Sequence, residues 1–208
     1  MHPTLRGSRV ILRPLCGGDA GDLLRHAGHP AIARYTTVPH PYTLKHARDF
    51  IASTGRERRA KLAYALGITV EGRVVGMMTL ANVDRNNCSA EVGYWVSKRH
   101  WRRGYTREAL LLILQFGFGS LGLERIYARV MHPNRASAAL LEQAGFTSEG
   151  RLRREVFRHG RWYDDLRYSI LRREWQRSRR ALRRLSTRIA PQGSRAGQDR
   201  GQRRPAPL

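Results

Sequence analysis

The sequence predicts an α/β protein of the α+β kind, with helices packed on one mixed central sheet. Hydrophobic residues make up 41% of the 208 positions, which is enough to bury one sizeable core. β-branched and aromatic runs recur along residues 8–171, with helical patterns between them. Several runs are joined by short turns, which favours antiparallel pairing at the sheet edges. We therefore expect about seven strands and about four helices in one domain.

The expected elements follow the hydrophobic patterns and the positions of glycine and proline. Strands are expected at residues 8–15, 61–70, 74–84, 88–96, 124–132, 148–157 and 161–171. Helices are expected at residues 17–28, 44–60, 106–116 and 133–146. Glu71–Arg73 and His159-Gly160 are expected to form hairpin turns, and Pro39 and Pro41 indicate a loop before the second helix.

Arginine dominates the charge of this chain. The net charge is +23, and only three of the 39 basic residues are lysines. A codon bias towards arginine explains this, and so does a surface that binds RNA or another polyanion. Residues 172–208 carry a net +10 and the rest of the chain +13. We place the domain at residues 1–175, followed by an arginine-rich tail, residues 176–208, whose composition predicts disorder.

Several classes of protein are disfavoured by this sequence. No apolar run approaches the roughly 18–20 residues that a membrane span needs. The N-terminus has no apolar signal-peptide core. Cys16 and Cys88 lack metal-ligand spacing, and the eight histidines form no cluster with them, so we expect no metal and a reducing compartment. We therefore expect a cytoplasmic protein without a membrane partner.

The stretch Glu91–Leu114 carries the strongest local signal for a ligand. A strand runs into a basic turn, Ser97–Gly104, which leads into an amphipathic helix. Free backbone N–H groups and the positive end of the helix dipole converge at such a junction. Arg102 and Arg103 add charged donors, so a phosphate or pyrophosphate is the expected ligand. The turn has neither a GxxxxGK[ST] nor a GxGxxG pattern.

Three stretches, in this order, resemble one family. They are EVGYWVSKRHWRRGYTREAL, similar to a strand, pyrophosphate loop and helix; PNRASAALLEQAGF, similar to an Asn-x-x-Ser-x-x-Leu-x-x-x-x-Gly-Phe helix; and EGRLRREVFRHGRWYDDLRYSILRREW, similar to a closing hairpin. The chain from Ser8 to Trp175 thereby resembles the general N-acetyltransferase (GNAT) superfamily, and within it the RimJ/RimL-type protein N-acetyltransferases. The resemblance implies the GNAT fold and an acyltransferase that moves an acetyl group from acetyl-CoA directly to a primary amine.

The resemblance also implies roles for individual residues. The residues implied to bind the CoA pyrophosphate are Arg99, Arg102, Arg103, Gly104, Tyr105, Thr106 and Arg107. The main chain of Trp95 and Val96 would pair with the pantetheine arm, and Asn134 would hydrogen-bond it. Ser137 would lie near the thioester, contact the cofactor there and protonate the departing thiolate.

The sequence departs from the family pattern in the loop, and it leaves the catalytic base open. Arg102 stands where the loop usually has its first glycine, and Thr106 where a small alanine is common. A positive φ at Arg102 would cost stability or reshape the loop. Glu91 is the favoured base for deprotonating the amine. The glutamate position of related enzymes falls on Val156, with Glu155 expected on the opposite face.

Several other residues near the motifs have two open interpretations. Asp164 is a candidate for the acceptor pocket or for an ion pair that stabilises a turn. His132 is a candidate for acid–base chemistry or for a satisfied residue at a strand end. Tyr94, Tyr105 and Trp101 flank the loop, where aromatic residues are expected to belong to the core or to a lid.

The RimJ/RimL resemblance implies a protein N-terminal amine as acceptor, such as that of a ribosomal protein. One alternative is a small-molecule amine or antibiotic acetyltransferase, although a domain of net +13 should repel polycations unless its pocket is acidic. The other is a catalytically inactive GNAT-fold module that binds RNA or the ribosome through its basic surface and tail, recognisable by steep salt dependence. Monomer and homodimer are both open.

Overall fold

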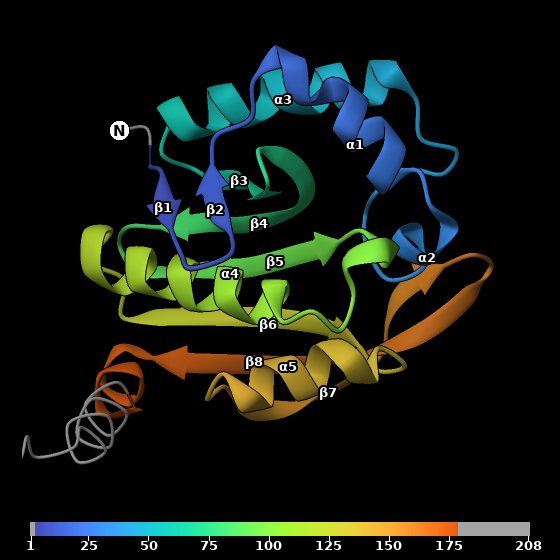
Figure 1. Ribbon diagram of the computed structural model, residues 1–208. Helices are drawn as coiled ribbons and strands as arrows, with labels where there is room; N and C mark the ends of the chain where they lie inside the picture. The colour runs from blue at the N-terminus through green and yellow to red at the C-terminus, as the bar shows by residue number, and fades with distance from the viewer. Residues whose placement is uncertain (1–2, 179–208) are drawn as a thin grey trace, which may run out of the picture.

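The computed structural model describes residues 3–178 as a sheet with helices on both faces (Figure 1). The strands are β1 (Leu5–Arg6), β2 (Ile11–Arg13), β3 (Tyr64–Val70), β4 (Arg73–Asp84), β5 (Ser89–Val96), β6 (Arg125–Met131), β7 (Thr147–Arg158) and β8 (Arg161–Leu171). The helices are α1 (Ala20–Ala27), α2 (Pro30–Ala33), α3 (Leu44–Arg59), α4 (Tyr105–Gln115) and α5 (Arg135–Gln143). Short helical turns are η1 (Gly17–Asp19), η2 (Lys98–His100) and η3 (Phe116–Ser120). From residue 179 onward, the expected tail lies outside the described residues.

The sheet is mixed, with the strand order β1-β2-β3-β4-β5-β6-β8-β7. Within the described chain β5 and β6 form the one parallel pair, and all other neighbouring strands are antiparallel. The predicted α/β fold with a mixed sheet and antiparallel edges is confirmed. Among residues 3–178, no helix has the length and apolar character to cross a membrane.

The structure adds two elements to the predicted order, β1 and α2. Gly7 donates its N–H to the carbonyl of Val10, so the strand expected at residues 8–15 becomes the second arm of a short hairpin. The turn lies close to α4, because a Cβ added at Gly7 would be 2.3 Å from a carboxylate oxygen of Glu108. The helix α2, whose N-cap is His29, is only four residues long, too short to show a hydrophobic period.

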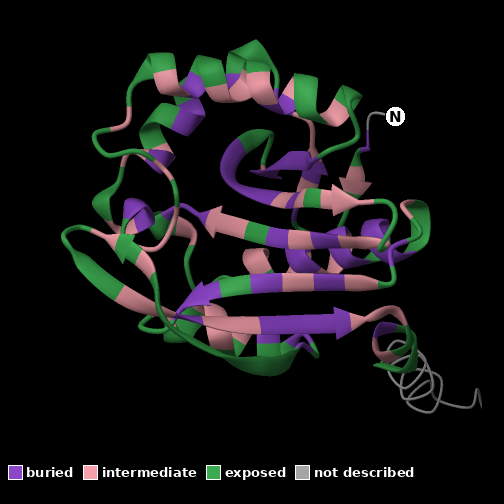
Figure 2. Cartoon of the chain, turned by 180° about the vertical axis from the view of Figure 1, so that it is seen from behind, coloured by how far each residue is buried: buried purple, intermediate pink, exposed green. Residues whose placement is uncertain are grey.

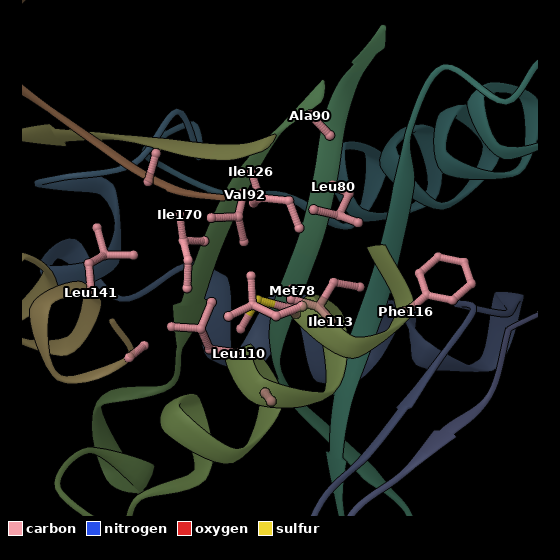
Figure 3. Close-up of a cluster of buried hydrophobic side chains, with 14 of the residues drawn as sticks. Met78, Leu80, Ala90, Val92, Leu110, Ile113, Phe116, Ile126, Leu141 and Ile170 are labelled. Carbon is pink, nitrogen blue, oxygen red and sulfur yellow. The ribbon is translucent and has the colours of Figure 1, made fainter. Parts of the chain in front are cut away.

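The main core lies between the sheet and the helices α4 and α5 (Figure 3). Side chains from β4, β5, β6 and β8 meet the apolar side of α4 there; those labelled in Figure 3 include Met78, Leu80, Val92, Leu110, Ile113, Ile126 and Ile170, and all are buried. The apolar residues of α4 recur at helical spacing, which is why one side of the helix is buried. This packing fixes the N-terminus of α4 beside the end of β5.

A smaller core lies on the opposite face of the sheet, under α1 and α3 (Figure 1). Leu23 of α1 and Ala47 of α3 pack there with Met77 of β4, and Trp95 of β5 packs against this cluster. Met78 belongs to the main core, so neighbouring residues of β4 point to opposite faces, as strand alternation requires. The two helical layers therefore reach β5 from opposite sides.

Two-residue turns close both predicted hairpins. Glu71 and Gly72 have φ angles of 50° and 79°, and His159 and Gly160 have φ angles of 49° and 75°. Positive φ at both central positions matches the right-handed twist of the flanking strands, so these hairpin turns are confirmed. The second hairpin, β7–β8, ends the sheet, and β7 is exposed along most of its length (Figure 2).

Candidate active site

The strands β5 and β6 separate where their pairing ends. Residues 89–91 pair in parallel with residues 125–127, and no later residue of β5 pairs with β6. Both strands continue beyond that point. Residues 92–95 and 128–131, from the two unpaired halves, line one cavity of about 840 Å³. The sheet therefore opens into a gap at the end where β5 leads to α4 and β6 leads to α5.

Hydrogen bonds at the two ends of β5 show which of its backbone groups face the gap. The N–H of Ser97 donates to the carbonyl of Val75 on the β4 side. The carbonyl of Cys88 accepts the N–H of Arg125 on the β6 side. Since neighbouring residues of a strand direct their backbone groups to opposite sides, even-numbered residues of β5 face the gap and odd-numbered residues face β4.

This alternation decides what β5 offers to a ligand. The N–H and C=O groups of Tyr94 and Val96 face the gap. Those of Trp95, expected to bind the pantetheine arm, face β4, where Trp95 is paired with Met77. The carbonyl of Val96 already accepts the indole N–H of Trp101 at 2.7 Å. Tyr94 thus offers the backbone groups that the sequence interpretation assigned to Trp95.

The N-terminus of α4 presents unpaired backbone donors. Gly104 is the N-cap, with a φ of 77°, and no side chain in the described residues caps the helix there. The carbonyl of Gly104 accepts the N–H of Glu108. The preceding N–H groups, on Tyr105, Thr106 and Arg107, have no partner within the helix, as for any first helical turn. Together with the helix dipole they form an anion site.

The arginines of the loop are free to contact such an anion. Arg99 in η2, Arg102 and Arg103 in the loop and Arg107 in α4 are all exposed. Arg102 has a φ of 59°, so the position where the family usually has glycine does require the left-handed region. An arginine there carries a steric cost that glycine avoids.

Glu108 and Arg9 connect the loop and the start of α4 to the β1–β2 hairpin. The Glu108 carboxylate accepts the hydroxyl of Ser8, the backbone N–H of Arg9 and the Nε of Arg9, the last at 3.0 Å. Burial raises the pKa of Glu108, but these hydrogen bonds outweigh it and leave the pKa below its usual value. Nη1 of Arg9 donates to the carbonyl of Arg103 at 3.0 Å. The β1–β2 hairpin therefore fixes the loop and the start of α4.

Asn134 and Ser137 stand at the start of α5, where they line the cavity. Oδ1 of Asn134 accepts the N–H of Ser137 at 3.3 Å and so caps the helix. The side-chain Nδ2 of Asn134 bonds to no residue between 3 and 178, whereas its backbone N–H donates to the carbonyl of Met131. The hydroxyl oxygens of Ser137 and Tyr94 are 2.8 Å apart. Burial raises the pKa of Tyr94 to about 12, so its phenol is protonated at neutral pH.

Four carboxylates line the cavity, and they differ in their partners. Three form ion pairs: Asp49 with Lys45, Glu155 with Arg167, and Asp165 with Arg129 and Arg167. The fourth, Glu91, forms no ion pair within residues 3–178. Its Oε2 accepts the amide N–H of Asn82 at 3.1 Å. Glu91 is therefore the cavity carboxylate best placed to take a proton or hold an ammonium group.

A bulge in β7 brings Glu155 into the same cavity. The register with β8 shifts between Leu152 and Val156, and the intervening Arg154 has a φ of 51°. Both Glu155 and Val156 line the cavity. The bulge lies next to Glu155, the residue expected to face away from Val156, and Glu155 pairs with Arg167 of β8.

Asp164 stabilises this bulge from β8. It accepts the backbone N–H of Arg154 at 2.8 Å and pairs with the guanidinium of Arg151. These contacts lower the pKa of Asp164. Asp164 does not line the cavity, which supports the turn-stabilising interpretation. His132, exposed at the end of β6, is outside the cavity as well, and its N–H donates to the carbonyl of Asp164.

Similarity to known proteins establishes the family to which this chain belongs. Residues 9–147 match the family model described as an acetyltransferase (GNAT) domain. The chain is a member of the GNAT family. It is 30% identical over 174 residues to the "Uncharacterized N-acetyltransferase YoaA" of Bacillus subtilis (strain 168), covering 83% of this chain and 98% of that protein. The predicted acyltransferase class is confirmed, and acetyl-CoA is the acetyl donor that GNAT acetyltransferases use.

Two further similarities support the GNAT assignment. The chain is 32% identical over 130 residues to the "Putative ribosomal N-acetyltransferase YdaF" of Bacillus subtilis (strain 168), covering 62% of this chain and 71% of that one. The crystal structure of a "Probable acetyltransferase" superposes with a TM-score of 0.74 at 27% identity, covering 83% of this chain and 99% of the other. The predicted GNAT fold is thereby confirmed, as is the resemblance to ribosomal N-acetyltransferases.

The GNAT site contains residues that the sequence motifs did not single out. Glu91, Asn134 and Ser137 meet in one cavity, and the loop lies at the start of α4, as expected from their motifs. Arg9 and Glu108 were missed, since their contact joins positions 99 residues apart. Within residues 3–178, no cluster of three or more His, Cys, Asp and Glu side chains is suited to hold a metal ion.

Proposed function

We propose that this GNAT enzyme transfers an acetyl group from acetyl-CoA to the N-terminal amine of a protein, with a ribosomal protein as the acceptor class that YdaF suggests. The observation that carries the proposal is the cavity at the gap between β5 and β6. A carboxylate without an ion pair, Glu91, and a hydroxyl pair, Ser137 with Tyr94, both line it. A proton acceptor and a proton donor thus line the same cavity.

The residues present fit acetyl-CoA. Backbone N–H groups at the start of α4, with Arg102 and Arg103 beside them, suit a pyrophosphate. The backbone groups of Tyr94 facing the gap suit the amides of a pantetheine arm, which would lie along β5 as an added strand. The side-chain Nδ2 of Asn134, which has no partner within residues 3–178, supplies a further donor from the other side of the gap.

Glu91 acts as the base in this proposal. An ammonium group must lose a proton before its nitrogen can attack the thioester carbon, and Glu91 accepts that proton. Because side chains alternate along β5, Glu91 shares a face with Trp95, which packs under α1 and α3. Tyr94 packs against the main core on the opposite face, with α4 and α5. The amine and the cofactor therefore approach the gap from opposite faces of the sheet.

Ser137 acts as the acid. When the carbon–sulfur bond breaks, the sulfur takes the hydroxyl proton of Ser137. The hydroxyls of Tyr94 and Ser137 share a hydrogen bond of 2.8 Å, in which either oxygen can donate, and the scheme uses the arrangement in which Tyr94 donates to Oγ of Ser137. Ser137 then directs its own proton elsewhere, into the gap. Tyr94 is a positioning residue in this scheme, acting through Ser137.

The charge of the cavity favours a single amine over a polyamine. Three of its four carboxylates are neutralised by arginine or lysine, which leaves Glu91 to receive one ammonium group. A polyamine carries several positive charges, and its further ammonium groups would meet Arg158 in the same cavity. A protein N-terminus carries one such charge.

The test compares acceptors directly. Peptides with a free N-terminus, the same peptides with a blocked N-terminus, and spermidine are each incubated with the enzyme and acetyl-CoA. CoA release gives kcat/KM, and mass spectrometry locates the acetyl group. We expect acetylation at the α-amine of free peptides only. A higher kcat/KM for spermidine than for every peptide would overturn the N-terminal assignment and favour a small-molecule amine.

A further inference from the structure

The tip of the β7–β8 hairpin, residues 151–162, is an exposed cationic surface. It contains five arginines and one glutamate: Arg151, Arg153, Arg154, Arg158, Arg161 and Glu155. The side chains of Phe157 and Trp162 are also open to solvent, at 60% and 51% exposure. Figure 2 shows the outer part of this hairpin largely in the colour of exposed residues. Nothing in the catalytic scheme uses this surface.

The hairpin tip stands at the cavity. Residues 155–158 line the cavity together with residues 35–39 of the loop after α2. The guanidinium of Arg158 donates to the carbonyl of Thr36, which joins the hairpin tip to that loop. Figure 1 shows the end of the hairpin rising beside α2. Arg158 therefore lines the same cavity as Glu91, and the other arginines of the hairpin tip lie within a few residues of it along the chain.

The arginines of the hairpin tip are only partly neutralised. Arg158 and Arg161 are direct cross-strand partners on either side of the turn, a like-charge pairing that destabilises a hairpin. The cross-strand aromatic pair of Phe157 and Trp162, with ring centroids 5.1 Å apart and ring planes tilted by 53°, offsets that cost. Arg153 and Arg161 form no ion pair with any residue between 3 and 178. Unpaired positive charge beside a substrate path suits a negatively charged partner.

We propose that the acceptor is an acidic polypeptide, whose N-terminal amine enters the cavity while carboxylates of the following residues bind the arginines of the hairpin tip. The inference rests on the proposed N-terminal acetyltransferase function and specifies its substrate class. The charges of the protein are complementary to those of such a peptide. A carboxylate inside the cavity suits the N-terminal ammonium group, and guanidinium groups outside the cavity suit the acidic side chains that follow it.

An acidic peptide fits the hairpin tip better than RNA. Single-stranded RNA binds by stacking its bases on open aromatic faces. Here the Arg154 guanidinium lies 5.8 Å from the centroid of the Trp162 ring, and Phe157 packs against the same ring. Arginine forks pair as readily with carboxylates, without needing a stacking surface.

The experiment uses three peptides of equal length, each beginning with a free alanine and followed by acidic, neutral or basic residues. Steady-state acetylation is measured with the full-length enzyme at low and high salt. We expect KM for the acidic peptide to be at least about tenfold below that for the neutral peptide at low salt, with similar kcat, and the difference to shrink at high salt. The basic peptide should have the highest KM.

Variants of the hairpin tip test whether its arginines cause the difference in KM between the peptides. Arg153→Ala combined with Arg161→Ala should raise KM for the acidic peptide about tenfold and leave kcat and the neutral peptide unchanged. Arg85→Ala, an exposed arginine in the β4–β5 turn, is the matched control and should change nothing. Arg161→Glu should shift the preference towards the basic peptide. The side chains of Arg153 and Arg161 form no ion pair within residues 3–178, so these variants should remain folded.

The outcomes separate the inference from the function on which it rests. Equal KM values for the three peptides would overturn the acidic-acceptor inference while leaving N-terminal acetylation intact. If the enzyme binds acetyl-CoA but acetylates none of the three peptides, both the acidic-acceptor inference and the N-terminal acetyltransferase function are overturned. Charge-indifferent acetylation together with binding of single-stranded RNA that Arg153→Ala and Arg161→Ala abolish would assign the hairpin tip to RNA instead.

Discussion

The hydroxyl of Tyr94 lies 2.8 Å from Oγ of Ser137, and this contact joins β5 to α5 across the open end of the sheet. It connects the unpaired half of β5 to the helix that follows β6. The contact fixes the position of the serine hydroxyl, because the two oxygens share one hydrogen bond. Tyr94 therefore contributes twice, with its backbone facing the gap and its side chain holding Ser137.

Removing either hydroxyl should slow the chemical step. Ser137→Ala should lower kcat by about 10²–10⁴-fold, the usual contribution of a general acid. Tyr94→Phe should lower kcat by about tenfold and move the pH profile, because Ser137 remains but loses its orientation. Both should leave the affinity for acetyl-CoA nearly unchanged by calorimetry. Additive effects in the double variant would contradict the linkage between these two residues.

Glu91→Gln should separate catalysis from binding. Without the carboxylate the acceptor amine keeps its proton, so kcat/KM should fall by about 10²–10⁴-fold and recover in part as pH rises. Acetyl-CoA should bind as before. Glu155→Gln is the matched control, because Glu155 lines the same cavity but is already paired with Arg167. If Glu155→Gln costs more activity than Glu91→Gln, the base has been misassigned.

Arg102→Gly should stabilise the protein. Arg102 holds a φ of 59°, which glycine adopts without the clash of a Cβ, so the free energy of unfolding should rise by about 1 kcal/mol. Arg103→Gly is the control in the same loop, since Arg103 has no positive φ and should lose stability on the same change. Chemical denaturation measures both. A loss of stability in Arg102→Gly would mean that the guanidinium contributes more than the strain costs.

The stability of the protein should respond to Tyr94 at high pH. The pKa of Tyr94 rises from 10.0 to about 12 in the fold. Its contribution is fully present below pH 10 and is lost as the pH approaches 12, because the unfolded chain ionises first. The advantage of the wild type over Tyr94→Phe, about 0.5–1.5 kcal/mol at neutral pH, should therefore shrink above pH 10. An advantage that stays constant to pH 11 would contradict the raised pKa.

Local chemistry made much of the fold predictable. Gly104 after a strand and before an apolar helical pattern marks the start of α4, and His159-Gly160 marks a two-residue hairpin. Ser137 falls one turn after Asn134 on the same helix, so their proximity followed from the sequence. Each of these signals lies within a few residues of the feature it predicts.

Contacts set by tertiary packing were not predictable in this way. Glu108 accepts a hydrogen bond from Arg9, which lies 99 positions away in the sequence, and no local pattern connects the two residues. The bulge before Val156 contains a cross-strand hydrogen bond between Arg154 and Asp164, ten positions apart, which the two-residue pattern of a strand does not predict. The burial that keeps Tyr94 protonated likewise arises only when β5 packs against α5.

Calorimetric titration of acetyl-CoA into the full-length protein tests the central claim most directly. The account predicts micromolar binding that Asn134→Ser weakens about tenfold or less, since serine keeps the helix cap of α5 but lacks the free amide donor. Glu91→Gln is the control on the acceptor side and should bind acetyl-CoA like the wild type. No binding at near-millimolar acetyl-CoA would contradict the assignment of the β5–β6 gap and the α4 N-terminus as the cofactor site.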